Sequence, residues 1–166
     1  GIGKTEAELA LALDEGILCI NVESEPELHF LSSIAAAKGR IAHVSVRVNP
    51  DIDAKTHHKI ATGKAENKFG IPISRAREVY AHAARLKGVR VSGVDMHIGS
   101  QITDLTPFAD AFALLAEFVQ VLRADGHTIS HVDLGGGLGI PYRDDAEVPP
   151  EPAAYAAIVK NATRGL

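Results

Sequence analysis

Residues 89–101, Val-Arg-Val-Ser-Gly-Val-Asp-Met-His-Ile-Gly-Ser-Gln, join a strand-like segment to a run of small and polar residues. The short apolar run 89–96 predicts a buried strand. Asp95 and His97 stand at its C-terminal end, and Gly99 and Ser100 follow. In parallel α/β folds, ligands bind beyond the C-terminal ends of the strands. This stretch therefore predicts a strand with a ligand site at its end.

The flanking sequence alternates between predicted helices and strands. Four helices are predicted to begin at residues that can cap a first turn, namely Thr5, Ser24, Ser74 and Asp104. A fifth helical pattern begins near the end of the chain. Four apolar runs predict strands, at residues 17–22, 41–48, 89–96 and 129–134. These strands are interpreted as continuously apolar, as in a parallel sheet covered by helices on both faces. Length alone favours an open doubly wound sheet, since a complete (β/α)8 barrel takes about 250 residues.

Glycines follow the last predicted strand, in Asp133-Leu-Gly-Gly-Gly-Leu-Gly139. Backbone N–H groups without side chains around them suit a phosphate. The alternative is a tight turn after a strand. No Gly-Lys-Ser/Thr follows, so the cluster is not a P-loop, and the glycine spacing does not fit a dinucleotide fingerprint.

His97 is the candidate catalytic residue, because an imidazole at a strand end can stack on a flat ring or move a proton. The alternative is a structural histidine. Glu23, Asp95 and Asp133 also lie at predicted strand ends. They are candidates for acid–base work and, equally, for orienting neighbouring groups.

Composition excludes several other classes of protein. The net charge is −4 with scattered basic residues, which argues against a nucleic-acid surface. No apolar run is long enough to cross a bilayer. The single cysteine, Cys19, is expected to be buried, cannot form an internal disulfide and fits a reducing cytoplasm. The adjacent His57 and His58 do not have metal-ligand spacing. No metal site is expected, and the remaining histidines are interpreted as surface or structural residues.

Five motifs, in order, resemble the diaminopimelate decarboxylase family. Two of them follow the first and second predicted strands, Asn21-Val-Glu-Ser24 and Arg47-Val-Asn-Pro50. The third is the polar segment 55–71, with Lys55-Thr-His-His-Lys-Ile60 and Lys68-Phe-Gly-Ile71. The others are His97-Ile-Gly-Ser-Gln101 and Leu134-Gly-Gly-Gly-Leu-Gly139.

The resemblance implies an architecture that replaces the open doubly wound sheet. Members of this family have a (β/α)8 barrel that binds pyridoxal phosphate (PLP) and a separate β-rich domain. The four predicted strands would be barrel strands four to seven, about four βα units. Residues 1–166 would be the central part of the barrel domain. The N-terminal barrel strands and the C-terminal β domain would lie outside the chain.

The resemblance also assigns roles to residues. The implied cofactor-binding residues are Arg47, His97, Ser100, Gly135, Gly136 and Gly137. His97 would stack on the pyridine ring, and Arg47 would lie near the polar edge of that ring. Ser100 and the backbone N–H groups of the three glycines would bind the phosphate. Lys68 would lie near a homodimer interface.

The implied reaction is PLP-dependent removal of the D-centre carboxylate of meso-diaminopimelate, which gives L-lysine and carbon dioxide, in a cytoplasmic homodimer. The family's PLP-bonding lysine would precede Gly1, and none of the lysines of this chain stands in a strand-end motif. The chain by itself is therefore predicted to be inactive. Alternatives are a decarboxylase of ornithine, arginine or carboxynorspermidine, a non-catalytic protein that binds PLP or phosphate, and an open-sheet regulatory domain.

Overall fold

The computed structural model describes residues 1–50, 69–141 and 148–166, and its elements alternate as predicted. In chain order they are α1 (Glu6–Asp14), β1 (Ile20–Val22), α2 (Glu25–Ala37), β2 (Ala42–Asn49), β3 (Ile71–Pro72), α3 (Ile73–Ala83), β4 (Val89–Asp95), α4 (Thr106–Ala124), β5 (His131–Asp133) and α5 (Pro152–Ala162). Most of the polar segment 55–71, including His57, His58 and Lys68, lies outside the described residues.

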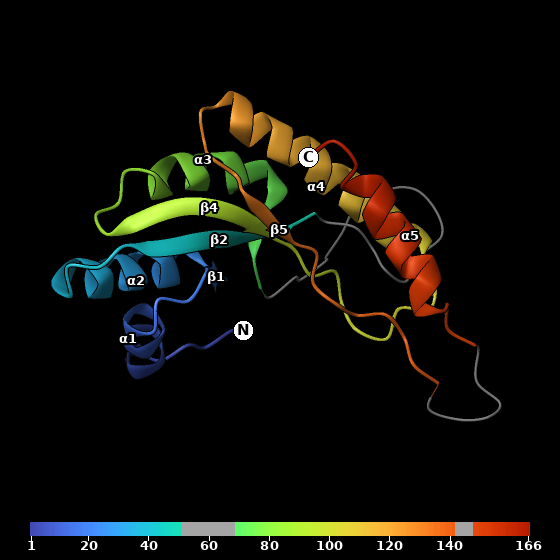
Figure 1. The fold of residues 1–166 in the computed structure, drawn as a ribbon, viewed down its shortest axis with the longest axis horizontal. Helices are drawn as coiled ribbons and strands as arrows, with labels where there is room; N and C mark the ends of the chain where they lie inside the picture. The colour runs from blue at the N-terminus through green and yellow to red at the C-terminus, as the bar shows by residue number, and fades with distance from the viewer. Residues whose placement is uncertain (51–68, 142–147) are drawn as a thin grey trace.

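The strands form one parallel sheet in the order β1-β2-β4-β5 (Figure 1). One row of valines crosses it, because Val22 pairs with Val46, Val46 with Val94, and Val94 with Val132. The two-residue β3 was not predicted, since it is too short to leave a pattern. It pairs with the end of β2 beyond the point where β1 stops.

The sheet curls so strongly that side chains from its two edge strands meet. Asn21 Nδ2 on β1 donates to Asp133 Oδ2 on β5 over 2.9 Å, although two strands lie between them. A flat sheet would hold strands three places apart more than 10 Å from one another. This curvature is that of a barrel wall, and the predicted partial barrel is confirmed.

The strands are not continuously apolar, contrary to the prediction. In β2 the residues Ala42, Val44, Val46 and Val48 are at most 1% exposed, and the residues between them are polar. Successive strand side chains point to opposite faces of a sheet. The apolar set therefore faces the helices, and the polar set faces the concave interior of the arc.

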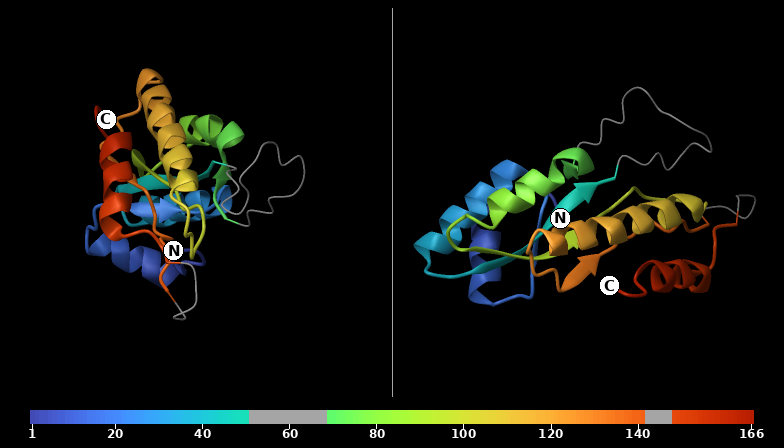
Figure 2. Two further views of the ribbon diagram at one scale, coloured as in Figure 1. Left: turned by 90° about the vertical axis from the view of Figure 1, so that its right-hand side faces the viewer. Right: turned by 90° about the horizontal axis from the view of Figure 1, so that it is seen from above.

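The helix-covered face holds the core. Figure 2 (left), which looks onto the C-terminal ends of the strands, shows helices arranged around the outside of the arc. The predicted apolar stripe of α4 is confirmed, because each of its five members is fully buried: Phe108, Phe112, Leu115, Val119 and Leu122. Tyr80 of α3 is also buried, and its hydroxyl donates to Gly93 O at 2.9 Å and contacts Val46 N and O at 3.2 Å. This hydroxyl fastens a helix to two strands.

The helix starts follow the predictions only in part. The capping box of Thr5 and Glu8 is present. Ser24 caps α2, but the Glu27 carboxylate reaches Glu23 N instead of closing the box. Ser74 does not cap α3, which begins at Ile73 directly after β3. The pairing of β3 with β2 fixes the chain at Pro72, two residues before Ser74, so the helix starts earlier.

Asp104 was expected at the N-cap position of α4, but it lies one residue before that position. Its carboxylate accepts from Thr106 N at 2.8 Å, while the helix N-cap position is Leu105. Among the described residues, no helix combines the length and the apolar character needed to cross a membrane.

Candidate functional site

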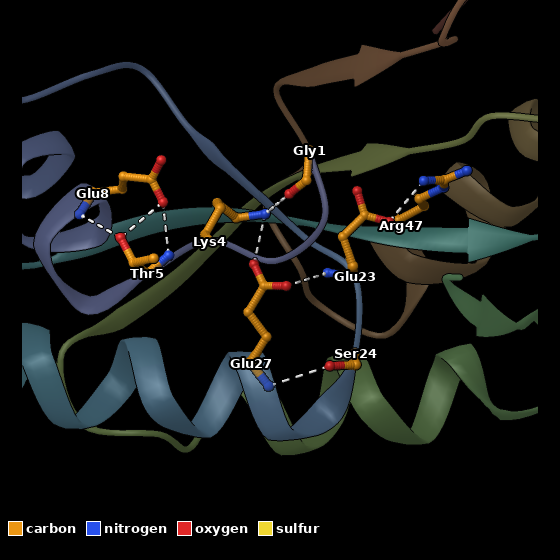
Figure 3. A network of polar contacts seen from close by, with 8 residues as sticks. All are labelled: Gly1, Lys4, Thr5, Glu8, Glu23, Ser24, Glu27 and Arg47. Atoms are coloured by element: carbon orange, nitrogen blue, oxygen red, sulfur yellow. Dashed lines mark hydrogen bonds and ion pairs between the residues drawn. The ribbon is translucent and has the colours of Figure 1, made fainter. Parts of the chain in front are cut away.

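Arg47 is the centre of the charged cluster at the strand ends. It lies near the end of β2, and its Nη1 forms an ion pair with Glu23 Oε2 at 2.7 Å (Figure 3). Its Nη2 donates to the His97 carbonyl oxygen at 3.4 Å. Both charged side chains are largely buried, at 15% and 8% exposed. Arg47 thus links the ends of β1 and β2 to the histidine motif after β4.

The cluster extends to the N-terminal loop of the chain. Lys4 Nζ lies 2.6 Å from Glu27 Oε1, and the other oxygen of Glu27 accepts from Glu23 N at 3.3 Å. Figure 3 shows Lys4, Glu27, Glu23 and Arg47 in succession. Lys4 was expected to lie outside the strand-end motifs. The structure instead places it beside them, because Glu27 in the first turn of α2 turns toward the N-terminal loop.

The glycine motif packs against the histidine motif. Gly136 N approaches His97 Nδ1 at 3.4 Å. A Cβ atom on Gly135 would overlap the Met96 carbonyl oxygen, and one on Gly137 would overlap that of Gly99. Both glycines have positive φ, of 68° and 109°. The two loops can approach this closely only because these positions carry no side chain.

A second set of bonds fixes the two loops in register. Ile102 N donates to Gly137 O, and Gly139 N donates to Ile102 O, each at 2.9 Å. The side-chain amide of Gln101 bonds both the N–H and the carbonyl of Ile140. Gln101 has φ of 58°, a left-handed conformation that non-glycine residues rarely adopt. The strain at Gln101 is offset by this double clamp.

Asp133 orients the start of the glycine loop. Its Oδ1 accepts from Gly135 N at 2.9 Å, and its Oδ2 accepts from Asn21 Nδ2 at 2.9 Å. Of the two roles left open for the strand-end carboxylates, this geometry supports orientation for Asp133.

The buried carboxylate of Asp95 lies among other charges. Burial, and then repulsion from Asp133, raise the pKa of Asp95 to about 6, and attraction to Arg47 opposes them. Burial and the nearby Arg47 lower the pKa of His97, which favours the neutral imidazole. A neutral ring at this place suits stacking better than a cation would.

Deeper in the concave interior, a row of polar side chains was not anticipated. Ser45 Oγ lies 3.1 Å from both Cys19 Sγ and His131 Nε2. In register, Gly93 stands between Ser45 and His131, and a Cβ atom on it would overlap both. Cys19 is half-buried and free, less enclosed than expected. The signal in the sequence was the polar alternation of β2, which was interpreted as apolar.

An open hollow of about 890 Å³ adjoins these groups on the concave side. Its lining includes Lys4, Asn21, Asp133, Gly135 and Tyr155. Of the predicted cofactor-binding residues, only Gly135 lines it. His97, Arg47 and the other two glycines come together beside the hollow, and Ser100 lies exposed where Gly137 meets the histidine loop.

The fold and the site define a class of protein: a segment of a parallel (β/α) barrel with glycine and histidine loops joined at its strand ends. The sequence matches the family described as "Pyridoxal-dependent decarboxylase, pyridoxal binding domain" over residues 1–164, and the chain belongs to this family. The predicted family and its cofactor, PLP, are confirmed at this level. The open-sheet regulatory domain is excluded.

Relatives within the family are diaminopimelate decarboxylases. That of Vibrio cholerae is 53% identical over 94% of this chain, and that of Haemophilus influenzae is 49% identical over 94%. The chain spans 37% of the length of each. The crystal structure of diaminopimelate decarboxylase from Helicobacter pylori complexed with L-lysine superposes with a TM-score of 0.88. It shares 40% identity over 100% of this chain and 42% of that one. A viral arginine decarboxylase, at 22% identity and a TM-score of 0.71, shares the fold.

The residues present fit the cofactor. A phosphate needs N–H donors that no side chain blocks, and the space around the Cα of Gly136 is open. Within the described residues, the N–H of Gly137 donates to no protein group. The described part of the chain contains no cluster of three or more His, Cys, Asp or Glu residues that could hold a metal ion.

Proposed function

We propose that this chain is the central part of the PLP-binding barrel domain of a diaminopimelate decarboxylase. The whole protein would convert meso-diaminopimelate to L-lysine and carbon dioxide, as a cytoplasmic homodimer. The relatives at about 50% identity support the substrate, and the free thiol of Cys19 is compatible with the compartment. The barrel strands before β1 and a C-terminal β domain would be supplied by the rest of that protein.

The observation that carries the site is the contact of 3.4 Å between Gly136 N and His97 Nδ1. It brings the glycine loop, which would bind the phosphate, next to His97, which would stack on the ring. We assign ring stacking to His97 and phosphate binding to Ser100 and the N–H groups of Gly135, Gly136 and Gly137. The N–H of Gly137 is the free donor among the described residues, whereas those of Gly135 and Gly136 would have to leave Asp133 and His97 to reach the phosphate. When bound, PLP supplies the electron sink that makes loss of a carboxylate possible.

The residues around His97 act on its position and charge. Glu23 holds Arg47 against the carbonyl of His97, so the imidazole and the guanidinium keep a fixed relation. The lowered pKa of His97 favours the neutral form of its ring, and Arg47 would offer its charge toward the polar edge of the cofactor. Asp133 sets the direction of the Gly135 N–H through a direct hydrogen bond.

The test is release of carbon dioxide by the full-length protein from meso-diaminopimelate, L-ornithine and L-arginine. We expect diaminopimelate to be preferred by at least about 100-fold in kcat/KM, since a buried charged group left unpaired by a wrong substrate costs several kcal/mol. A preference for ornithine or arginine would replace the proposed substrate with the alternative. Binding of PLP without release of carbon dioxide from any of the three would favour the non-catalytic alternative.

The assignment of His97 is tested by His97→Ala, with His43→Ala as the matched control on a strand of the same sheet. We expect His97→Ala to weaken PLP binding by roughly tenfold or more, through lost stacking, and to shift the absorption band of the bound cofactor. Equal effects of the two substitutions would argue against the assignment.

The predicted inactivity of residues 1–166 alone depends on the lysines. Lys4 is the one that the structure brings to the strand ends, but its ammonium group is already engaged in an ion pair with Glu27. Addition of PLP, reduction with borohydride and peptide mapping should reveal no stoichiometric label on any lysine of the chain. Full labelling of Lys4 together with carbon dioxide release would overturn this prediction.

A further inference from the structure

A pair of histidines lies on the outer helix layer, away from the strand ends. His29 of α2 is exposed and His82 of α3 is half-buried, and their Nε2 atoms are 3.2 Å apart. We propose that His29 and His82 form a two-histidine site for a divalent transition-metal ion that prefers imidazole, such as Zn²⁺ or Cu²⁺. The sequence alone gave no reason to pair residues 53 positions apart, and each was interpreted as a surface or structural histidine.

The geometry of the rings fits joint ligation of one ion. Metal–nitrogen bonds of about 2.1 Å, with nitrogens 3.2 Å apart, subtend about 100° at the ion and place the centres of rings that point at it about 5 Å apart. In the structure the two ring centres are 4.9 Å apart. A straight N–H···N hydrogen bond of the same length would hold the centres about 5.5 Å apart. The rings are therefore inclined toward each other, an arrangement compatible with joint ligation of one ion.

The helices that carry the pair are held in place by contacts on either side of it. Arg75 of α3 bonds Glu25 of α2 at 2.7 Å, and Ser32 of α2 donates to Lys87 O at 2.8 Å. Figure 2 (right) shows α2 and α3 running side by side. Two imidazoles fixed in this way form a chelate without rearrangement of the backbone, and water would complete the coordination.

Charge near the pair also favours a cation. Glu78 precedes His82 by four residues on α3, and Glu25 precedes His29 by four residues on α2. Residues four apart lie on the same face of a helix. Each histidine therefore has a carboxylate one turn before it on its own helix, and the charge of Arg75 is matched by its partner Glu25. Arg85, three residues after His82, is a further cation on the same side of α3. Imidazole nitrogen with carboxylate or water is a donor set that suits Zn²⁺ and Cu²⁺ and disfavours Mg²⁺ and Ca²⁺.

The test measures metal binding by the full-length protein, free of any affinity tag. Calorimetric titration with Zn²⁺ should show one saturable site per chain that is weakened at least tenfold in His29→Gln and in His82→Gln. The Zn²⁺ affinity of the double variant should be close to that of either single variant, because loss of one ligand already breaks the chelate. His43→Gln should bind Zn²⁺ as the unchanged protein does. An affinity that is the same in the unchanged protein and the double variant would overturn the proposal.

A second measurement needs no substitution. The electron paramagnetic resonance spectrum of the protein with one equivalent of Cu²⁺ should show coupling to two imidazole nitrogens. Coupling to none or to one would refute joint ligation and leave the pair as a hydrogen bond between two rings. Because neither readout depends on decarboxylation, failure of this proposal is distinguishable from failure of the proposed function.

Discussion

The two faces of the sheet differ in how they are filled. The face toward the helices is packed with valine, phenylalanine and one tyrosine whose hydroxyl is fully bonded. The concave face carries Ser45, His131, Arg47 and Asp133, each joined to a neighbour by a hydrogen bond or an ion pair. One strand, β2, contributes to both faces by simple alternation.

This difference separates stability from chemistry. Burial of apolar area on the helix side stabilises the fold without directional requirements. On the concave side each polar group must find its partner, since a buried polar group without one costs about 1–3 kcal/mol. The concave face should therefore be sensitive to position and charge, and the helix face to volume.

The largest expected effect is loss of volume on the helix side. Phe112 is 1% exposed and packs against Phe108 and Tyr155. Phe112→Ala should lower the free energy of unfolding by about 3–5 kcal/mol, through lost burial and the cavity it leaves. Phe30→Ala, at a site 42% exposed, should cost less than about 1 kcal/mol. Urea unfolding followed by circular dichroism measures both, and equal losses would mean that α4 is not part of the core.

The next effect probes the space inside the concave face. Gly93→Ala should cost about 2–3 kcal/mol, since its Cβ would overlap the hydrogen-bonded Ser45 and His131. Gly136→Ala is the matched control, because nothing lies within 4 Å of its added Cβ. It should change stability by less than about 1 kcal/mol. Should both substitutions prove equally tolerated, the interior row of polar side chains is not tightly packed.

A third prediction concerns charge on the concave side. The pKa of Asp95 is raised to about 6 in the folded protein. The folded state then holds a proton that the unfolded state has lost, so the stabilising contribution is present near pH 4 and is lost as pH rises through 6. Asp95→Asn should remove this dependence on pH and raise the free energy of unfolding at pH 7 by on the order of 2 kcal/mol relative to the unchanged protein.

The measurement for Asp95 is the difference in unfolding free energy between variant and unchanged protein at pH 4, 5, 6 and 7. The gain should appear between pH 4 and 6 and be close to zero at pH 4. A difference that does not vary with pH would show that Asp95 is not the titrating group.

The smallest effect compares two ion pairs of different burial. Lys4 and Glu27 are 19% and 12% exposed, while Lys38 and Asp14 are 32% and 49% exposed. Lys4→Met should cost about 1–2 kcal/mol, because it leaves Glu27 as a buried charge without its partner. Lys38→Met should cost under about 0.5 kcal/mol. If thermal unfolding shows no difference between them, the N-terminal loop does not depend on Glu27.

Much of the fold and of the site was predictable. Local signals predicted the cap at Thr5, the apolar stripe of α4 and the alternation of helix and strand, because each depends on residues a few positions apart. The same reasoning placed the histidine and glycine motifs at strand ends, since parallel strands bring those ends to one edge. The resemblance of five ordered motifs then supplied the family and the barrel, which alternation alone could not distinguish from an open sheet.

The tertiary structure decided what depends on distant residues. The start of α3 was set by pairing of β3 with β2, so Ser74 lost its expected role. The approach of Asn21 to Asp133, and of Ser45 to His131 across Gly93, depends on the curvature of the sheet. That of Lys4 to Glu27 depends on how the N-terminal loop meets the first turn of α2. Periodicity carries no information on curvature. It shows to which face of the sheet a side chain points, but not the distance between strands that are not direct neighbours. That is why the sequence determined the strands and their motifs, and only the folded chain determined which polar groups became partners.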